Sequence, residues 1–318
     1  MKVLVALLVA CLPAGATDAV KIWDKAPYNS FTDLSYYGGR WICVFREGAS
    51  HFPKDGEGII RVVASSDGSR WDSIAELQFA GRDLRDPKLS VTPQGELMLT
   101  VGAVIPDVNA KPRVRTLSWF SRDGVRWGAP VQNGEDGFWL WRVTWHKGVA
   151  YSVAYAGRSN VMRLYASRDG RGFSIALDDM GLTDFPNEAT LLFRDDDTAY
   201  CFVRRDDGSK TALLGWSKPP YRQWQWKDLG RRVGSPHFIN SPGGRMIGAV
   251  RYFEGEVRRV SIVELSETSG MKELQALPSS NGDSGYAGLF WKDGELWVSY
   301  YSTHDRKRTS IYLARWKP

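Results

Sequence analysis

The chain has 318 residues, which is long enough for two ordinary domains or one large β domain. Its 14 Trp, 13 Tyr and 13 Phe, beside a charged fraction of 25%, exclude a disordered or fibrous protein. Three Cys without a C-x-x-C pair exclude a disulfide scaffold and a cysteine-based zinc module. The net charge of +6 is dispersed along the chain, so we expect no nucleic-acid partner.

The first 16 residues predict an export signal rather than part of the fold. Met1-Lys2 and the apolar run from Val3 to Ala10 have the pattern of a signal peptide and are too short to span a membrane. Ala14-Gly15-Ala16 is an A-x-A cleavage site, whereas Leu8-Val9-Ala10-Cys11 resembles a lipobox that would place a lipid anchor on Cys11. Both alternatives predict export. A cleaved signal peptide would give a secreted or periplasmic protein, and a lipid anchor would give an outer-membrane lipoprotein. No later apolar run is long enough for a transmembrane helix.

Residues 20–318 predict a single all-β domain. Short apolar or alternating runs bounded by Gly, Asp and Pro recur in chain order at 41–45, 59–64, 96–101, 149–155, 198–203, 245–250, 295–300 and 310–314. No long stretch has the apolar spacing of an amphipathic helix.

A turn motif of the form S-x-D-G-x-x-W recurs between these strands. Residues 65–71 and 121–127 match it fully, residues 167–173 match it less well, and residues 217–224 and 266–270 are degenerate copies. In this motif the Asp caps the turn, the Gly takes a positive φ, and the aromatic side chain packs on the hairpin. Successive serines lie 56, 46, 50 and 49 residues apart, the length of a four-stranded blade. The spacing predicts a six-bladed β-propeller, with a strand at 20–23 closing the last blade against 310–316.

Polar side chains stand where several of the apolar strands begin or end, which in a propeller surrounds the central axis. Converging carboxylates, arginines and a phenol suit a sugar, above all an acidic one, because an Arg guanidinium binds a carboxylate through two hydrogen bonds. Carboxylate pairs also catalyse glycoside hydrolysis. We therefore expect a glycan or glycoconjugate substrate. The residues concerned are Arg46, His51, Glu188, Arg204 or Arg205, Arg251, Asp283 and Tyr286.

These motifs resemble the sialidase superfamily, six-bladed propeller glycosidases with Asp boxes (BNR repeats). The resemblance covers most of residues 30–316, and Asp86-Pro87-Lys88-Leu89 resembles the N-P-x-P strand start of the family. For catalysis, the resemblance implies Tyr286 as the nucleophile, Glu188 as the group that activates it and Asp55 as the acid/base.

The resemblance also implies that Arg46, Arg204 and Arg251 bind the substrate, with Arg258 as a substitute for Arg251. The chain departs from the family at 30–34, where Ser-Phe-Thr-Asp-Leu replaces F/Y-R-I-P and removes the first arginine of the carboxylate-binding triad. We expect Asp33 to face the axis there. It would repel a substrate carboxylate by roughly 1–4 kcal/mol at about 4 Å.

His51 has no counterpart in the family pattern. It is expected to bind the sugar, to act as a second general acid, or to be structural. Trp139, Trp141 and Trp145 are expected to pack in the core or to stack on a sugar, with core packing expected for at least two of them. His237 has no partner at metal-ligand spacing, and we expect no metal and no other cofactor.

The sequence thus favours an exported sialidase-like glycoside hydrolase that cleaves a terminal sugar, expected to be acidic. One alternative is a different glycosidase, acting on a uronate or neutral sugar with Asp33, Asp55 and Glu188 as its carboxylates. A second is a lyase that eliminates uronates with His51 and Tyr286 as acid and base. A third is a non-catalytic glycan-binding propeller, which would not depend on Glu188 or Tyr286.

Overall fold

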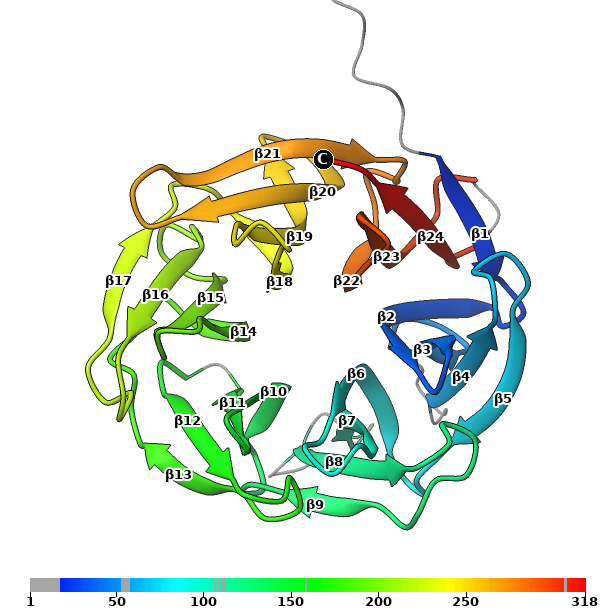
Figure 1. The fold of residues 1–318 in the computed structure, drawn as a ribbon, viewed down its shortest axis with the longest axis horizontal. Coiled ribbons are helices and arrows are strands. Elements are labelled where there is room, and N and C mark those ends of the chain that lie inside the picture. The colour runs from blue at the N-terminus through cyan, green and yellow to red at the C-terminus, as the bar shows by residue number, and fades with distance from the viewer. Residues whose placement is uncertain are drawn as a thin grey trace, which may run out of the picture.

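Six four-stranded antiparallel sheets form a ring of blades around a central axis (Figure 1). The computed structural model describes residues 18–52, 58–105, 107, 109, 113–157, 159–305 and 308–318, and in these ranges all regular structure is strand. The predicted all-β, six-bladed propeller is confirmed. The predicted signal peptide at 1–16, including Cys11, and the predicted acid/base Asp55 lie outside the described residues.

Each of the first three blades is built from four consecutive strands, from the axis to the rim. The first holds β2 (Tyr28–Tyr37), β3 (Arg40–Gly48), β4 (Ile59–Ser65) and β5 (Asp72–Leu77). The second holds β6 (Asp83–Val91), β7 (Leu97–Val104), β8 (Val114–Ser121) and β9 (Val131–Asn133). The third holds β10 (Trp139–His146), β11 (Val149–Tyr155), β12 (Met162–Ser167) and β13 (Ser174–Leu177).

The last three blades repeat this order, and the sixth is completed by the N-terminal strand. The fourth blade holds β14 (Pro186–Phe193), β15 (Ala199–Arg205), β16 (Leu213–Ser217) and β17 (Gln225–Asp228). The fifth holds β18 (Val233–Asn240), β19 (Met246–Glu254), β20 (Val257–Ser266) and β21 (Gly270–Leu277). The sixth holds β22 (Gly285–Lys292), β23 (Glu295–Ser302), β24 (Ser310–Trp316) and β1 (Ala19–Trp23).

The ring is closed where the first and last blades meet. Strand β1 pairs antiparallel with β24, from Ala19 opposite Ala314 to Trp23 opposite Ile311, as the sequence predicts. Trp41 of β3 stacks on Trp297 of β23 with 4.2 Å between ring centroids. Large buried aromatic side chains of this kind dominate core energetics, so this stack holds the two ends of the chain together.

The recurring S-x-D-G-x-x-W turns connect the third and fourth strands of their blades. In the first blade, Asp67 Oδ1 accepts hydrogen bonds from the backbone N–H groups of Ser69 at 2.8 Å and Arg70 at 3.2 Å. Trp71 Nε1 donates to the carbonyl of Gly68 at 3.0 Å, which folds the indole back on the turn. Gly68 has φ +81°, and a Cβ there would lie 2.4 Å from the ring of Trp297. The turn therefore needs glycine both for its backbone and for its contact with the next blade.

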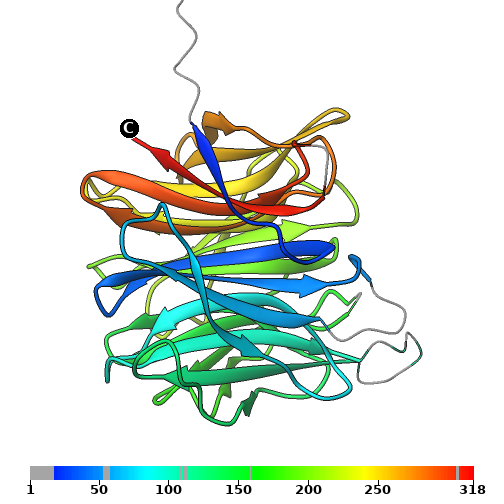
Figure 2. The same ribbon diagram turned by 90° about the vertical axis from the view of Figure 1, so that its right-hand side faces the viewer.

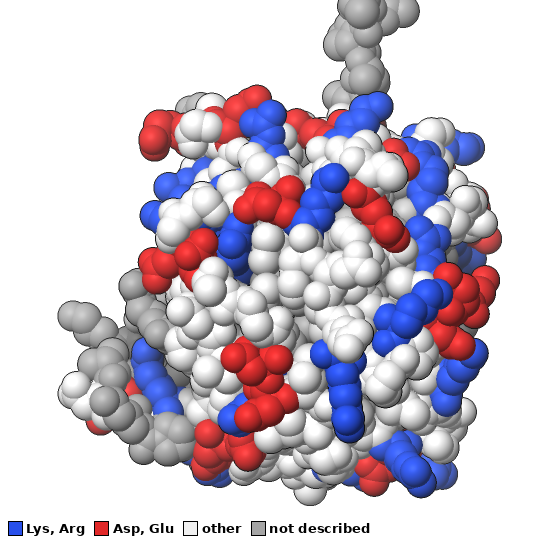
Figure 3. Space-filling model, turned by 90° about the vertical axis from the view of Figure 1, so that its left-hand side faces the viewer, with Lys and Arg blue, Asp and Glu red and all other residues white. Residues whose placement is uncertain are grey.

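Viewed from the side, the strands run between the two faces of the ring (Figure 2). Each innermost strand therefore starts near one face and ends near the other. On the outer side shown in Figure 3, Lys and Arg are interspersed with Asp and Glu and no patch of one sign dominates. Within the described ranges, no helix has the length and apolar character needed to cross a membrane.

We expect Asp67→Ala to lower the melting temperature, because the variant leaves the N–H groups of Ser69 and Arg70 without their acceptor. Thermal unfolding followed by circular dichroism measures this. Asp72→Ala is the matched control, an exposed aspartate to which the described residues offer no hydrogen bond. An unchanged melting temperature for Asp67→Ala, or an altered substrate preference, would contradict a structural role for this turn.

Candidate active site

A β-bulge interrupts each of the six innermost strands at the same level. In β14, for example, Pro186 faces Arg205 and Ala189 faces Val203, so two residues of β14 oppose one of β15. Such a bulge turns side chains away from the regular alternation of a strand and is common beside active sites. The six bulges bring their side chains together around the axis. They comprise Phe31-Thr32, Asp86-Pro87, Trp141-Arg142, Asn187-Glu188, Ser235-Pro236 and Tyr286-Ala287.

The backbone at four of the bulges has a conformation that L-residues rarely adopt. Phe31, Asp86, Ser235 and Tyr286 have φ values of 58°, 51°, 49° and 51°. A positive φ is a genuine outlier for bulky side chains such as Phe and Tyr. Residues held in this way cluster at functional sites, where the surrounding structure compensates for the strain. The bulge level of the ring is therefore the candidate active site.

Glu188 and Tyr286 form the centre of this site. The Tyr286 hydroxyl donates to Glu188 Oε1 at 2.6 Å. The backbone N–H of Ser235 donates to Glu188 Oε2 at 2.7 Å, and the N–H of Tyr286 donates to Ser235 Oγ at 2.9 Å. Bulges of the fourth, fifth and sixth blades thus fix the phenol against the carboxylate.

Arg204 of β15 adds a positive charge to this pair. Its Nη1 lies 2.9 Å from Glu188 Oε1, and its Nη2 lies 2.8 Å from Asp206 Oδ2. Burial alone would raise the pKa of Glu188. The charge of Arg204 and the hydrogen bonds from Tyr286, Arg204 and Ser235 outweigh it and lower that pKa. Burial, together with the charges of Glu188 and Asp86, raises the pKa of Tyr286 well above its usual value. At rest, the site therefore holds a carboxylate and a protonated phenol.

The structure shows which of the neighbouring residues Arg204 and Arg205 faces the axis. The alternation of side chains along the strand did not decide this from the sequence. Arg204 lies opposite the β14 bulge and reaches the axis. The Arg205 guanidinium turns the other way, to Asp184 at 3.2 Å and Asp228 at 2.5 Å.

Arg251 of β19 lies next to Tyr286. Its guanidinium carbon is 5.6 Å from the centre of the Tyr286 ring, and its Nη2 is 3.1 Å from Asp283 Oδ1. Its Nη2 also lies 3.1 Å from the hydroxyl of Tyr301. The Arg251 side chain is 14% exposed, so a small part of it can be reached by a ligand. Arg258, the alternative from the sequence, is an exposed residue of β20 beside Phe253.

Arg46, predicted to bind the substrate, is fully buried. Its Nε donates to Asp83 Oδ1 at 2.7 Å and its Nη1 donates to the carbonyl of Ser50 at 3.1 Å. With no exposed side-chain surface, Arg46 is placed to hold the chain at Ser50 rather than to contact a sugar.

Asp33 lies in a buried ion pair rather than facing a ligand. Arg142 donates to both its oxygens, at 2.8 and 3.1 Å, and the N–H of Leu89 donates to Oδ2 at 2.6 Å. The side chain is 1% exposed. The repulsion expected from Asp33 is therefore offset by Arg142, a residue to which sequence analysis gave no role.

Asp86 and Lys88 of β6 are buried charged groups that sequence analysis did not place in the site. Burial raises the pKa of the Asp86 carboxyl and lowers that of the Lys88 amine. Lys88 Nζ lies 5.3 Å from the ring centre of Trp141 and 5.8 Å from that of Tyr286. Asp86 Oδ1 has no hydrogen-bond partner among the described residues. The sequence feature that could have indicated both residues is their position beside Pro87, close to the start of a strand.

Aromatic side chains surround Tyr286. Trp141 packs against Tyr286 with 5.9 Å between ring centroids and Phe31 at 4.8 Å, and both are only 2% exposed, so Trp141 belongs to the core. Trp139 stacks on Tyr155 at 6.0 Å, with both side chains only partly buried. A partly exposed aromatic surface next to charged groups suits the apolar face and hydroxyls of a sugar.

His51 lies at the edge of the same cluster. Its Nδ1 is 2.9 Å from Asp283 Oδ2 and 2.6 Å from the hydroxyl of Tyr28. Its ring centre is 5.5 Å from that of Phe31. The cluster thus contains His51, Glu188, Arg204, Arg251 and Tyr286 of the residues predicted from the sequence.

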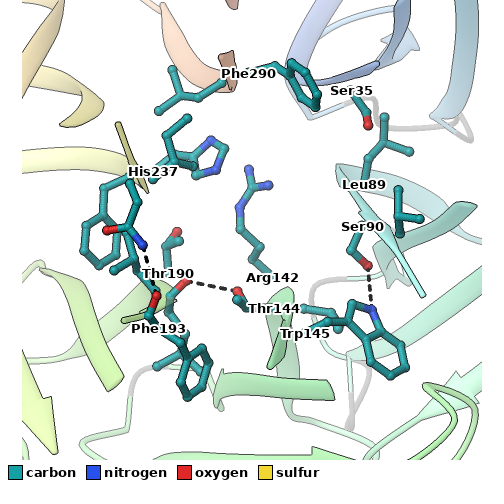
Figure 4. Close-up of a pocket in the computed structure, with 18 of the residues that line it drawn as sticks. Ser35, Leu89, Ser90, Arg142, Thr144, Trp145, Thr190, Phe193, His237 and Phe290 are labelled. Atoms are coloured by element: carbon teal, nitrogen blue, oxygen red, sulfur yellow. Dashed lines mark hydrogen bonds between the residues drawn. The ribbon is translucent and has the colours of Figure 1, made fainter. Parts of the chain in front are cut away.

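A separate cavity of about 420 Å³ opens at the other end of the axis. It is lined by later residues of the innermost strands, among them Ser90, Thr144, Thr190 and Phe193, and Arg142 points toward its middle (Figure 4). Of the predicted site residues that the structure describes, none lines it. In the described part of the chain, no group of three or more His, Cys, Asp or Glu side chains could hold a metal ion.

We expect Arg142→Met to destabilise the fold by about 3–5 kcal/mol, because it leaves the buried Asp33 carboxylate without its counter-charge. Urea unfolding measures the loss. The double variant Asp33→Asn/Arg142→Met should recover most of it, since the Asn oxygen can still accept the N–H of Leu89. A single variant as stable as the wild type would contradict the structural role of the pair.

Stability should also depend on the protonation of His237, whose Nδ1 lies 2.9 Å from the carbonyl of Ala287. Burial lowers its pKa from 6.5 to about 3, so the unfolded chain takes up this proton first as the pH falls. The contribution is fully present above about pH 6.5 and is lost toward pH 3, amounting to at most about 5 kcal/mol.

Urea unfolding at a series of pH values tests this. His237→Asn keeps an N–H donor near Ala287 but has no titratable group, so its stability should vary less with pH between 3 and 6.5. If the stability of the variant varied with pH as steeply as that of the wild type, groups other than His237 would cause the loss of stability in acid.

No protein-family model and no curated protein sequence matches this chain. Among solved structures, a protein of unknown function from Dyadobacter fermentans has a TM-score of 0.82 and 16% identity, over 96% of this chain and 99% of that one. A mutant alpha-L-arabinofuranosidase from Fusarium graminearum, in complex with an iminosugar inhibitor, has a TM-score of 0.71 and 15% identity, over 95% and 98%. A mutant Trypanosoma rangeli sialidase displaying trans-sialidase activity has a TM-score of 0.68 and 15% identity, over 95% of this chain and 57% of that one. This chain therefore has the six-bladed propeller fold seen in sialidase and arabinofuranosidase structures, and the resemblance to sialidase-like propellers is confirmed at the level of fold.

Proposed function

We propose that this protein is an exported glycoside hydrolase of sialidase type, which removes a terminal acidic sugar from glycans. The observation that carries the proposal is the 2.6 Å hydrogen bond from the Tyr286 phenol to the Glu188 carboxylate, with Arg204 and Arg251 beside it. Export is proposed from the signal-like pattern of residues 1–16 alone.

Tyr286 is proposed as the nucleophile. A phenol with a raised pKa is a weak nucleophile until a base takes its proton, and Glu188 is within hydrogen-bonding distance to do so. As Tyr286 Oη bonds to the anomeric carbon, its proton passes to Glu188 Oε1. In the second step, water displaces the phenoxide and Glu188 returns the proton. The sugar thus leaves with its original anomeric configuration.

A tyrosine nucleophile suits an acidic sugar for an electrostatic reason. If the anomeric carbon bears a carboxylate, an attacking Asp or Glu would approach against a like charge, whereas a neutral phenol meets no such repulsion. Arg204, beside Glu188, and Arg251, over the ring of Tyr286, supply positive charge next to this nucleophile. Arg forks bind carboxylates with two parallel hydrogen bonds.

The reaction also needs a group that protonates the leaving oxygen and later activates water. The resemblance to sialidases assigns this role to Asp55, outside the described residues. Glu188 is already committed to Tyr286 through its Oε1.

A neutral sugar is the second candidate substrate, and the arrangement around Arg46 and Asp33 favours it. Both side chains are buried in ion pairs, so only two of the arginines predicted to bind a carboxylate reach the site. The uncommitted Oδ1 of Asp86 offers a carboxyl partner for a sugar hydroxyl instead. The fold likeness to an alpha-L-arabinofuranosidase is compatible with this alternative.

A panel of fluorogenic sialosides, uronosides and neutral glycosides tests the proposal with the purified mature protein. We expect release from the sialoside, and Tyr286→Phe should reduce kcat by about 10³-fold or more, because it removes the nucleophile. Tyr300→Phe is the matched control, since the hydroxyl of that buried tyrosine donates to the carbonyl of Pro278 and bonds no other group among the described residues. Release of only a neutral sugar would support the second candidate. Full activity of Tyr286→Phe would exclude the tyrosine mechanism.

A further inference from the structure

We propose that His51, oriented by Asp283, is the acid/base of this active site, an inference that rests on the proposed function. His51 follows β3 in the first blade, and this blade stands across the ring from the fourth blade, which carries Glu188 (Figure 1). Ring contacts connect His51 to Phe31 at 5.5 Å and Phe31 to Tyr286 at 4.8 Å. A sugar bound against Tyr286 would thus have Glu188 on one side and His51 on the other.

Asp283 fixes the orientation of the imidazole. His51 Nδ1 lies 2.9 Å from Asp283 Oδ2, while Asp283 Oδ1 accepts from Tyr301 at 2.5 Å and Arg251 at 3.1 Å. Burial would raise the pKa of Asp283, but hydrogen bonds from His51, Tyr28 and Tyr301 and the charge of Arg251 lower it. The Tyr28 hydroxyl donates its proton to Asp283 Oδ2, so it has none to give to Nδ1. Because an ionised carboxylate only accepts hydrogen bonds, Nδ1 then carries its own proton and donates to Asp283.

The other ring nitrogen is then the one that can exchange a proton. His51 Nε2 makes no hydrogen bond with any residue in the described ranges, and the side chain is 37% exposed. A carboxylate that binds one imidazole nitrogen sets the tautomer and stabilises the protonated ring. This arrangement leaves Nε2 free to meet the leaving oxygen of a substrate.

Two buried arginines hold the backbone that carries this histidine. Arg85 Nη2 donates to the carbonyl of His51 at 2.5 Å, and Arg46 Nη1 donates to the carbonyl of Ser50 at 3.1 Å. The Arg85 guanidinium also lies 5.1 Å from the ring centre of Phe31 and 4.5 Å from that of Phe52. Arg46 thereby acts as a positioning residue for His51, in place of the substrate contact expected from the sequence.

Asp283 lies three residues before Tyr286, in the segment that leads into β22. One short stretch of chain therefore carries the proposed nucleophile and the group that orients the acid. Arg251 contacts Asp283 and lies over the Tyr286 ring, which ties both to the fifth blade.

The proton balance of the two steps is complete with these groups. When the glycosidic bond breaks, His51 Nε2–H gives its proton to the leaving oxygen, while Tyr286 bonds to the anomeric carbon and Glu188 takes the phenol proton. In the second step, water gives a proton to His51 Nε2 and its oxygen bonds to the anomeric carbon. The bond to Tyr286 breaks and Glu188 returns the phenol proton, so all three groups end as they began.

The charges around His51 are mixed, as an acid that must also become a base requires. Asp283 and the hydroxyl of Tyr28 face Nδ1, and Asp283 favours the protonated ring. Arg85 beneath the backbone and Arg251 on the far oxygen of Asp283 disfavour it. In the first step, His51 must carry a proton on Nε2 that it can give to the leaving oxygen.

The test compares wild type and His51→Asn in the full-length mature protein with methyl, methylumbelliferyl and dinitrophenyl glycosides of the sugar that the wild type releases. Asn can still donate to Asp283 from near the Nδ1 position, but it cannot transfer a proton. We expect kcat/KM for the methyl and methylumbelliferyl glycosides to fall by about 10²–10⁴-fold. The dinitrophenyl glycoside should change by only a few fold, because its leaving group needs no proton.

Asp55→Asn and Tyr286→Phe are measured beside it. Equal losses on all leaving groups in His51→Asn would indicate a merely structural role and overturn the proposal, as would a dependence on the leaving group that appears in Asp55→Asn instead. Tyr286→Phe should lose activity on every glycoside. A wild type inactive on the whole panel would overturn the proposed function itself, and a wild type that acts through Tyr286 while His51→Asn behaves normally would overturn the histidine assignment alone.

Discussion

The bulge in each innermost strand is the constraint on which the site depends. A regular strand alternates its side chains between two faces, so a ring of six regular strands would direct every second residue into the packing between blades. The extra residue in each strand changes this alternation at one level of the axis. Glu188 and Tyr286 both lie in such bulges, and the positive φ of Tyr286 is part of the same distortion. Closure of the ring by β1, β24 and the Trp41–Trp297 stack keeps the bulges facing one another.

Charge balance separates the groups that build the site from those that can react. Asp33 with Arg142, and Arg46 with Asp83, are buried pairs with little exposed surface, and their charges are satisfied within the protein. Glu188 is also bound to an arginine, yet it shares its Oε1 with the Tyr286 hydroxyl. A carboxylate held between Arg204 and a phenol can accept a proton only when the phenol gains a new bond. This is the property that the proposed nucleophile requires.

The sequence could predict the fold because its signals are local. The S-x-D-G-x-x-W turns need only a few neighbouring residues, and their spacing predicted the number of blades. Glu188, Arg204, Arg251 and Tyr286 could be placed near the axis because Glu188 and Tyr286 precede an apolar run and the two arginines follow one. The structure brings these four residues together.

The roles expected for Arg46 and Asp33 could not be judged in this way. Their counter-ions lie 37 and 109 residues away in the chain, so their burial in ion pairs depends on tertiary structure. The choice between Arg204 and Arg205 depended on the position of a bulge, which changes strand parity without a sequence signal. Asp86 was missed as a site residue for the same reason, since it is a bulge residue.

Trapping of a covalent intermediate tests the central claim, that Tyr286 activated by Glu188 attacks the anomeric carbon. The protein is incubated with an activated fluorinated glycoside of the sugar that it releases, and the labelled peptide is identified by mass spectrometry. The account predicts a stable increase in mass of one fluorosugar on the peptide that contains Tyr286, with no label in Tyr286→Phe. A label on the peptide of Glu188 or Asp86, or turnover that inverts the anomeric configuration without any label, would contradict it.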